Sequence, residues 1–266
     1  TAVTTRPSVI VKDQFGNVVA GTSVTFSVYA GGGSITSATS TTSASGIATV
    51  GSWTLGTTVS AQEIRATSNG LRGSPISFTA TNIPDVPASL TVSAGNSQSA
   101  VVGTTVATNP AVLVKDQYSN VIPNATVAFT GATNSSTLQN TSAQTNSSGI
   151  ATMGTWRLGT TSGSNAFTAS INSLTVTFAA TGTPDAVTHL VKNSGDVQTA
   201  TVNTAVTAPT VIAKDQYENV VPSTSITWSV LSGGGSVSST AVTANGSGIA
   251  TSPTWTLGTV AGSNSL

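Results

Sequence analysis

The residue most suited to bind a ligand or a metal ion is an aspartate that recurs in a Lys-Asp-Gln segment, at Asp13, Asp116 and Asp215. Such a carboxylate could bind calcium, which takes about six to eight oxygen ligands, often from several carboxylates. It could also accept hydrogen bonds from nearby backbone N–H groups and so stabilise a tight turn. The whole chain has only 8 Asp and Glu residues, so each aspartate has few acidic neighbours. The pattern favours a turn, with calcium binding as the alternative.

Two further aspartates, Asp85 and Asp185, each follow a proline, Pro84 or Pro184. Proline fixes its own φ angle, which suits a linker between repeated parts of the chain. We expect these aspartates to cap or preset the linker, and a joint stiffened by calcium is the alternative. The sequence therefore predicts no metal site and no cofactor.

Residues for catalysis are scarce. His189 is the only histidine, so a Ser-His-Asp triad or a multi-histidine metal site would depend on it alone. Its place in a predicted strand beside a linker favours a structural or surface role. The chain has no cysteine, which excludes disulfides and a cysteine nucleophile, and its glycine-rich segments 30–34 and 232–236 lack a phosphate-binding lysine. We predict that the protein is not an enzyme and has no catalytic residues.

Tryptophan recurs at Trp53, Trp156 and Trp255. Exposed indole rings in a row would suit stacking on sugars, whereas buried rings would fill a core. Ile47 and Leu55 share the strand parity of Trp53, and this favours the core.

Charge and hydropathy narrow the range of partners. Lys and Arg number 8, Asp and Glu number 8, and charged residues make up only 6% of the chain. A chain without net charge offers no basic field to nucleic acid or to an anionic membrane. Hydrophobic residues make up 38% of the sequence, enough for a core, but no apolar run approaches the roughly 20 residues of a membrane helix. We predict no nucleic-acid partner and no membrane span in this segment.

The elements that position these residues repeat along the chain. Lys-Asp-Gln begins at Lys12, Lys115 and Lys214, which gives steps of 103 and 99 residues. The segments Gly-Ile-Ala-Thr and Trp-x-Leu-Gly-Thr recur with the same two steps. A shared register over such long steps indicates tandem domains and not a solenoid.

Each repeat has the pattern of β-structure. The segment 23–28 places Val24, Phe26 and Val28 on one side and polar residues on the other, a period of two that indicates a half-buried strand. Val9 and Val11 alternate in the same way, with the lysine that follows facing outward. No stretch has a sustained helical period.

Other strands follow from turn residues. Segment 89–94 predicts an opening strand, and segment 167–182 predicts a hairpin that turns at Asn172 and Ser173. About seven short strands per repeat predict an immunoglobulin-like (Ig-like) β-sandwich. The fold class is therefore all-β, with tandem Ig-like domains in an elongated array.

The repeats resemble the bacterial Ig-like (Big-1) domains of the invasin and intimin type. The first repeat matches the family pattern at Asp13, Gly16, Asn17, Val19, Gly21, Val24, Phe26, Thr42, Gly46 and Ala48. The later repeats keep Asp116, Asn120, Val127 and Phe129, and Asp215, Asn219, Ile226 and Trp228. They depart from the pattern at the glycine, which becomes Ser119 and Glu218. The resemblance implies export and attachment to surfaces or host cells, with ligand binding by a distal tip domain.

Aligning the repeats predicts three domains, over residues 1–84, 85–184 and 185–266. The first aligns without an opening strand and the third without a closing hairpin, so only the second is expected to be complete. Two explanations stay open. The sequence is a window cut from a longer array, or neighbouring copies supply the missing strands by β-strand addition.

Three functions are compatible with these patterns. The first is a structural spacer or stalk in an adhesin-like protein at the bacterial cell surface or outside the cell. The second is a subunit of a self-assembled extracellular filament, in which low charge opposes lateral packing only weakly. The third is a glycan-binding accessory module, which requires exposed tryptophans. The expected partners are neighbouring repeats, further copies in a fibre, or a host ligand bound through a tip domain.

Overall fold

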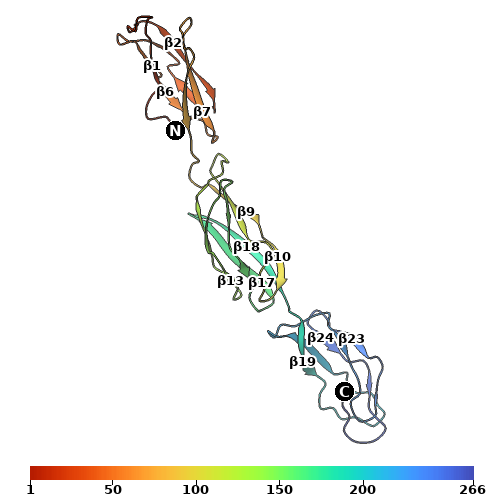
Figure 1. The fold of residues 1–266 in the computed structure, drawn as a ribbon. Coiled ribbons are helices and arrows are strands. Elements are labelled where there is room, and N and C mark those ends of the chain that lie inside the picture. Colours follow the sequence, from red (N-terminus) through yellow and green to blue (C-terminus); the bar gives the residue numbers. More distant parts are fainter.

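The computed structural model describes residues 1–266, which form strands, turns and loops without a helix. Strands β1–β8, β9–β18 and β19–β25 form three bodies, here termed the first, middle and third units (Figure 1). The units follow one another end to end, so the molecule is elongated (Figure 1). The all-β class and the elongated array predicted from the sequence are confirmed. Since the chain forms no helix, it contains no candidate transmembrane helix.

The middle unit is a sandwich of two main sheets. Its strands are β9 (Ser89–Ala94), β10 (Gln98–Val101), β11 (Ala111–Lys115), β12 (Thr126–Thr130), β13 (Thr137–Leu138), β14 (Ser142–Gln144), β15 (Ile150–Thr152), β16 (Trp156–Arg157), β17 (Gly163–Ile171) and β18 (Leu174–Thr183). One sheet has the order β15-β11-β9 and the other β10-β18-β17-β12-β14, while β13 pairs with β16. Strands β10 and β18 are parallel, and the other pairs are antiparallel. This is an Ig-like arrangement.

The core of the middle unit is a cluster of 14 buried residues drawn from both sheets. Val112 and Val114 of β11 contribute from one sheet, and Phe129 and Phe167 contribute from the other. Trp156 packs edge-on against Phe167, with ring centroids 4.7 Å apart and ring planes at 87°. Alternate residues of β12 and β17 face inward, which is why a period of two in the sequence predicts such strands.

The first unit has the same plan with fewer strands. They are β1 (Ser8–Ile10), β2 (Ser23–Ala30), β3 (Ser34–Thr36), β4 (Thr39–Thr41), β5 (Ile47–Thr49), β6 (Ser52–Thr54), β7 (Ala61–Thr67) and β8 (Ile76–Thr81). The sheets are β4-β2-β7-β8, β1-β5 and β3-β6, around 9 buried core residues. Strand β1 pairs only with β5, whereas its counterpart β11 pairs with both β9 and β15. Within residues 1–84, no strand takes the place that β9 has beside β11.

The third unit has the smallest core, with 5 buried residues. Its strands are β19 (Val187–Ser194), β20 (Thr210–Asp215), β21 (Ser225–Thr227), β22 (Ser236–Val237), β23 (Ala241–Thr243), β24 (Ile249–Thr251) and β25 (Trp255–Thr256). The sheets are β19-β20-β24, β21-β23 and β22-β25. Strand β21 pairs only with β23, whereas its counterpart β12 also pairs with β17. Residues 185–266 contain no counterpart of the β17–β18 hairpin.

The predicted hairpin of the middle unit is formed by β17 and β18. Ile171 pairs with Leu174 at its end, and Asn172 turns with a φ of 51°. Asparagine tolerates this left-handed conformation better than most residues. The predicted opening strand is β9, with the predicted bounds.

Two side chains predicted to face inward are exposed instead. Val28 is 36% exposed, because the register of β2 shifts between Val28 and Ala30 and the alternation ends there. Ile47 is 42% exposed, whereas its neighbour Ala48 is fully buried. Strand β5 pairs with β1 while β6 pairs with β3. The chain therefore changes sheets near Gly51, and a parity counted from Ile47 does not carry through.

Steric limits explain why each Gly-Ile-Ala-Thr segment begins with glycine. Gly149 has a φ of 74°, in the left-handed region that glycine enters readily. A Cβ atom at Gly149 would lie 2.9 Å from both the carbonyl oxygen of Val114 and the Cβ of Val121. This repeated landmark therefore marks a close backbone approach.

Candidate functional site

The Lys-Asp-Gln segment leads into a tight corner in every unit. In the middle unit, the backbone N–H groups of Tyr118 and Asn120 both donate to Asp116 Oδ1, at 2.9 Å each. The side-chain nitrogen of Asn120 donates to Asp116 Oδ2 at 2.8 Å. Asp13 and Asp215 accept the equivalent three hydrogen bonds. The turn predicted for these aspartates is present in all three units.

The three aspartates differ in burial. Asp116 and Asp215 are only 3% and 0% exposed, whereas Asp13 is exposed. Burial alone would raise the pKa of Asp116, but the hydrogen bonds that it accepts, led by that from Asn120, outweigh burial and hold the pKa below its usual value. The same balance lowers the pKa of Asp215. Both carboxylates are therefore ionised at neutral pH, although they are buried.

The asparagine that bonds to Asp116 also reaches the unit before it. Its side-chain nitrogen donates to the carbonyl oxygen of Thr57 at 2.8 Å. Its side-chain oxygen accepts from the N–H of Val59 at 2.9 Å. Both partners lie in the loop after β6, which spans 56–60 and is here termed the Gly-Thr loop. The Gly-Thr loop of the middle unit follows β16 and spans 159–162. One amide thus bonds the corner of one unit to the loop of its neighbour.

The joint between the middle and third units repeats this geometry. The side-chain nitrogen of Asn219 donates to the carbonyl oxygen of Thr160 at 2.8 Å, and its side-chain oxygen accepts from the N–H of Ser162 at 2.7 Å. Tyr217 also lies against the middle unit, since a Cβ at Gly103 would come within 3.2 Å of the tyrosine hydroxyl. The two joints therefore use equivalent asparagines, Asn120 and Asn219, in the same way.

The linker aspartates belong to the same joints. The N–H of Asp85 donates to Asp116 Oδ2 at 3.0 Å, and Gln117 donates to Asp85 Oδ2 at 2.7 Å. Asp185 makes the equivalent contacts in the second joint. The structure thus brings together residues that the sequence placed in separate turns and linkers. No group of three or more His, Cys, Asp or Glu residues is placed to hold a metal ion.

The sequence interpretation missed a buried amide that shapes the Gly-Thr loop from inside. Gln62 is fully buried, and its side-chain oxygen accepts from the N–H of Gly56 at 2.9 Å. Asn165 and Asn264 make the same bond in the other units, at 3.1 Å and 3.0 Å. A usable signal existed, because the steps between these amides are again 103 and 99 residues.

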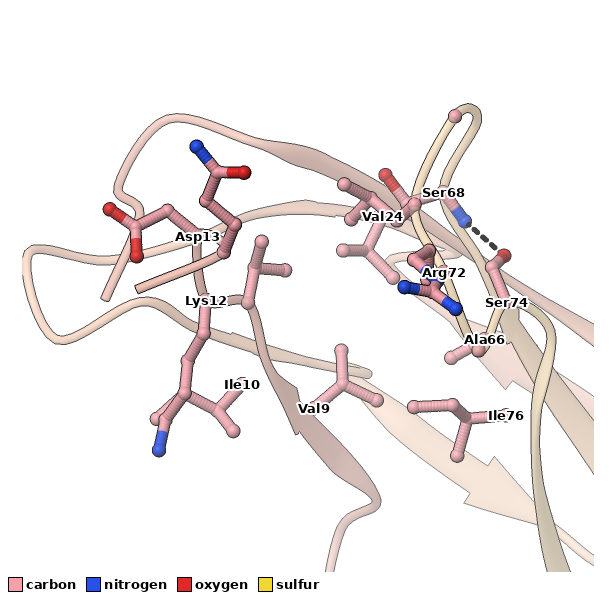
Figure 2. Close-up of a pocket in the computed structure, with 15 residues that line it drawn as sticks. Val9, Ile10, Lys12, Asp13, Val24, Ala66, Ser68, Arg72, Ser74 and Ile76 are labelled. Carbon is pink, nitrogen blue, oxygen red and sulfur yellow. Dashed lines mark hydrogen bonds between the residues drawn. The ribbon is translucent and has the colours of Figure 1, made fainter. Parts of the chain in front are cut away.

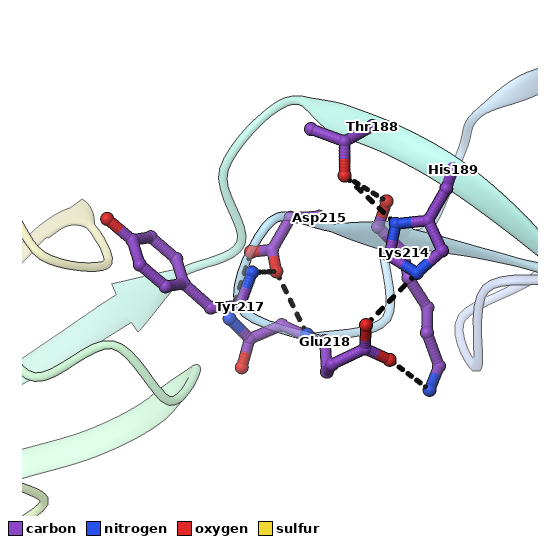
Figure 3. Close-up of polar contacts among 7 residues, drawn as sticks. Thr188, His189, Lys214, Asp215, Tyr217 and Glu218 are labelled. Carbon is purple, nitrogen blue, oxygen red and sulfur yellow. Dashed lines mark hydrogen bonds and ion pairs between the residues drawn. The ribbon is translucent and has the colours of Figure 1, made fainter.

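His189 lies on the exposed surface of β19, in a small polar cluster near the second joint (Figure 3). Its Nε2 atom is 3.1 Å from Glu218, which also accepts from Lys214 at 2.9 Å. The hydrogen bond from Lys214 lowers the pKa of Glu218 below its usual value. The hydroxyl of Thr188 lies 3.1 Å from the other ring nitrogen of His189, Nδ1 (Figure 3). The cluster thus pairs charges and polar groups at an exposed surface.

Two of the three repeated tryptophans, Trp53 and Trp156, belong to the buried cores of their units. Trp53 and Trp156 are 2% and 0% exposed, and Trp255 is half-buried in the open third unit. The indole N–H of each is buried without a hydrogen-bond partner. Core packing is therefore confirmed for two of the three rings, although the parity argument from Ile47 was wrong.

A groove of about 390 Å³ lies beside β1 in the first unit (Figure 2). Val9, Val24, Ala66 and Ile76 supply apolar side chains to it. The equivalent place in the middle unit is occupied by β9, whose Leu90 packs on the core. The groove thus coincides with the position of an opening strand.

No protein-family model matches the chain, and no curated protein matches it in sequence. Solved structures do match its fold. FdeC, an Escherichia coli adhesin, aligns with 94% of this chain and 82% of its own, with a TM-score of 0.54 and 22% sequence identity. InvD of Yersinia pseudotuberculosis aligns with 97% of this chain and 79% of its own, with a TM-score of 0.53 and 17% identity.

Both likenesses extend over all three units, so they concern the array as well as the single domain. They agree with the motifs around Asp13 and Asn17, which resemble those of invasin and intimin repeats. The chain therefore shares the tandem Ig-like fold of FdeC and InvD.

Proposed function

We propose that the chain is a run of spacer units in the stalk of an adhesin-like protein, located at the bacterial cell surface or outside the cell. The observation that carries this proposal is the repetition of one joint, in which Asn120 and Asn219 bond each corner to the preceding Gly-Thr loop. A joint with several fixed bonds resists bending, which a spacer requires. The fold shared with the adhesin FdeC supports a surface location.

The spacer units would span residues 1–84, 85–184 and 185–266. Their surfaces carry few charges, with 6% charged residues in the chain, and so offer little electrostatic attraction to other molecules. Ligand recognition would belong to another domain of the same protein. The units would hold that domain away from the cell.

Small-angle scattering of the purified chain tests the spacer shape. A compact protein of this length has a radius of gyration of about 18 Å. We expect a value well above this and a distance distribution with a long tail. A compact profile would contradict the stalk.

Binding of the purified chain to host cells tests the passive role. We expect no saturable binding, and deletion of residues 85–184 from the whole protein should shorten its reach without removing ligand affinity. Saturable binding by residues 1–266 alone would show instead that these units recognise a ligand.

A filament subunit is the second candidate, and the groove beside β1 favours it. Strand β1 has a free edge, and the groove has apolar walls suited to a leucine like Leu90. A strand from another copy could pair there by β-strand addition. Electron microscopy of concentrated protein would then show fibres of regular width. A peptide of residues 85–96 should block their growth by filling the groove, and the absence of fibres would exclude this candidate.

A glycan-binding role receives no support from the tryptophans. Trp53 and Trp156 are buried, so they cannot stack on a sugar in this fold. The likeness to FdeC is to an adhesin and not to an enzyme.

A further inference from the structure

The hydrogen bonds from each joint asparagine to the preceding unit all go to backbone atoms. Asn120 bonds to Thr57 O and Val59 N, and Asn219 bonds to Thr160 O and Ser162 N. The two loops differ in side chain at the last of these positions, valine in one and serine in the other. Peptide groups are present whatever the sequence, so this recognition depends on the loop's shape and not on its side chains.

The corner is fixed before it meets the loop. The side-chain nitrogen of Asn120 has two hydrogens, and Asp116 Oδ2 accepts one of them at 2.8 Å while Thr57 accepts the other at 2.8 Å. The carboxylate in turn accepts two backbone N–H groups of its own corner. The asparagine side chain is thus already oriented, which reduces the entropy lost when the joint forms.

The loop is fixed from its own side as well. Gln62 accepts from the N–H of Gly56 at 2.9 Å inside the first unit. The side chain of Asn82 donates to Gly56 O at 2.8 Å and to Thr58 O at 2.9 Å. The corner and the Gly-Thr loop therefore meet as two preformed surfaces, through a donor and an acceptor on one rigid amide. Two such hydrogen bonds fix the orientation of one unit relative to the next, whereas a single bond would allow rotation about it.

We propose that Asn120 and Asn219 set the angle between successive units, and that the corner is a docking surface for the Gly-Thr loop of any preceding Ig-like unit of this kind. The inference deepens the proposed stalk function and rests on it. Because the contact uses backbone atoms, one unit can replace another without loss of the joint. Asn17 is the matched reference, since it bonds to Asp13 in the same way but has no unit against it in this chain.

Spin-label distances can test the joints one at a time. The chain has no cysteine, so a label attaches only where a cysteine is introduced. We choose the exposed positions Thr79, Thr177 and Thr251, substituted in pairs across each joint. We expect Asn120→Ala to broaden the distance distribution between positions 79 and 177 at least twofold. The distribution between positions 177 and 251 should keep its width.

Asn219→Ala should give the opposite result, broadening only the second pair. Asn17→Ala should broaden neither, although it removes the same hydrogen bond inside its own corner. Narrow distributions in a folded Asn120→Ala protein would overturn the proposal, and so would equal broadening by Asn17→Ala.

A substitution in the Gly-Thr loop tests the joint without altering the corner, and so separates loss of the joint from misfolding of the corner. Val59→Pro removes the N–H that Asn120 accepts and leaves the corner untouched, so it should broaden the first pair. Val59→Ala keeps that N–H and should have no effect. Broadening by Val59→Ala would mean that the side chain is recognised. If the asparagines prove unimportant while scattering still shows a rod, the stalk function survives and only this inference fails.

Discussion

At the scale of single residues, the third position after each corner aspartate carries backbone strain. Ser119 and Glu218 have φ values of 69° and 67°, where the first unit has Gly16 at 90°. A left-handed conformation costs a residue with a Cβ about 1–2 kcal/mol, and glycine avoids that cost. All three corners therefore keep the same left-handed backbone conformation, and the two that have Ser119 or Glu218 in place of glycine keep it at a cost in stability.

We expect Ser119→Gly to raise the free energy of unfolding of the middle unit by about 0.5–1 kcal/mol. Relief of the φ strain should exceed the extra flexibility that glycine gives the unfolded chain. Denaturant melts would measure the change. Gly16→Ser is the reverse exchange, and stabilisation by both substitutions would refute the explanation.

The tryptophan at the centre of the middle unit should be a large contributor to its stability. Trp156→Ala removes a fully buried ring that contacts Phe167, and we expect a loss of about 3–5 kcal/mol. Trp255→Ala should cost less, because Trp255 is only half-buried. A loss below about 1 kcal/mol at Trp156, measured in denaturant melts, would be inconsistent with the core described.

At the scale of elements, the corner is the most repeated structure in the chain, and its carboxylate makes it sensitive to acid. The pKa values of Asp116 and Asp215 are lower in the folded protein than in the unfolded chain. Such groups stabilise the fold above the unfolded pKa of about 3.9. That stability is lost as the pH falls through the folded pKa.

We therefore expect the joints to loosen below about pH 4, with a fall in the melting temperature of the same protein. Spin-label distances across each joint, measured between pH 7 and pH 3, would detect the change. Asp116→Asn should weaken the first joint at neutral pH and remove its dependence on acid. An unchanged acid response in that variant would assign the effect to other groups.

Strands with regular alternation could be predicted from the sequence, and the interrupted ones could not. The hairpin of β17 and β18 has a long period of two and a two-residue turn, so local rules suffice. Strands β5 and β6 lie close together in the chain but belong to different sheets. Local alternation carries no information on which sheet a strand joins, and this is why Ile47 was assigned to the wrong face.

At the scale of the whole molecule, the repeat register predicted three units in a row, but it could not predict what joins them. The partners of Asn120 lie 61 and 63 residues earlier in the chain. A repeated asparagine in a turn has a sufficient local explanation, since it bonds to Asp116 in its own corner. The second role needed the positions of two units at once.

The parallel pair of β10 and β18 has a mechanical consequence for a molecule of this shape. Gln98 to Val101 run beside Ala180 to Thr183 in the same direction, and they precede and follow the body of the middle unit. Tension applied along the rod would pull these two strands in opposite directions along their length. Their hydrogen bonds would then be sheared together and not opened one by one.

Single-molecule pulling should therefore show one unfolding event at distinctly higher force than the others, because forced unfolding reports the barrier to leaving the native state. The event should release the length of the middle unit, which alone has this parallel pair. Equal forces for all three units would contradict the expectation. Strand β18, which closes the middle sandwich, would then also be the element that sets how much pull along the rod the middle unit withstands.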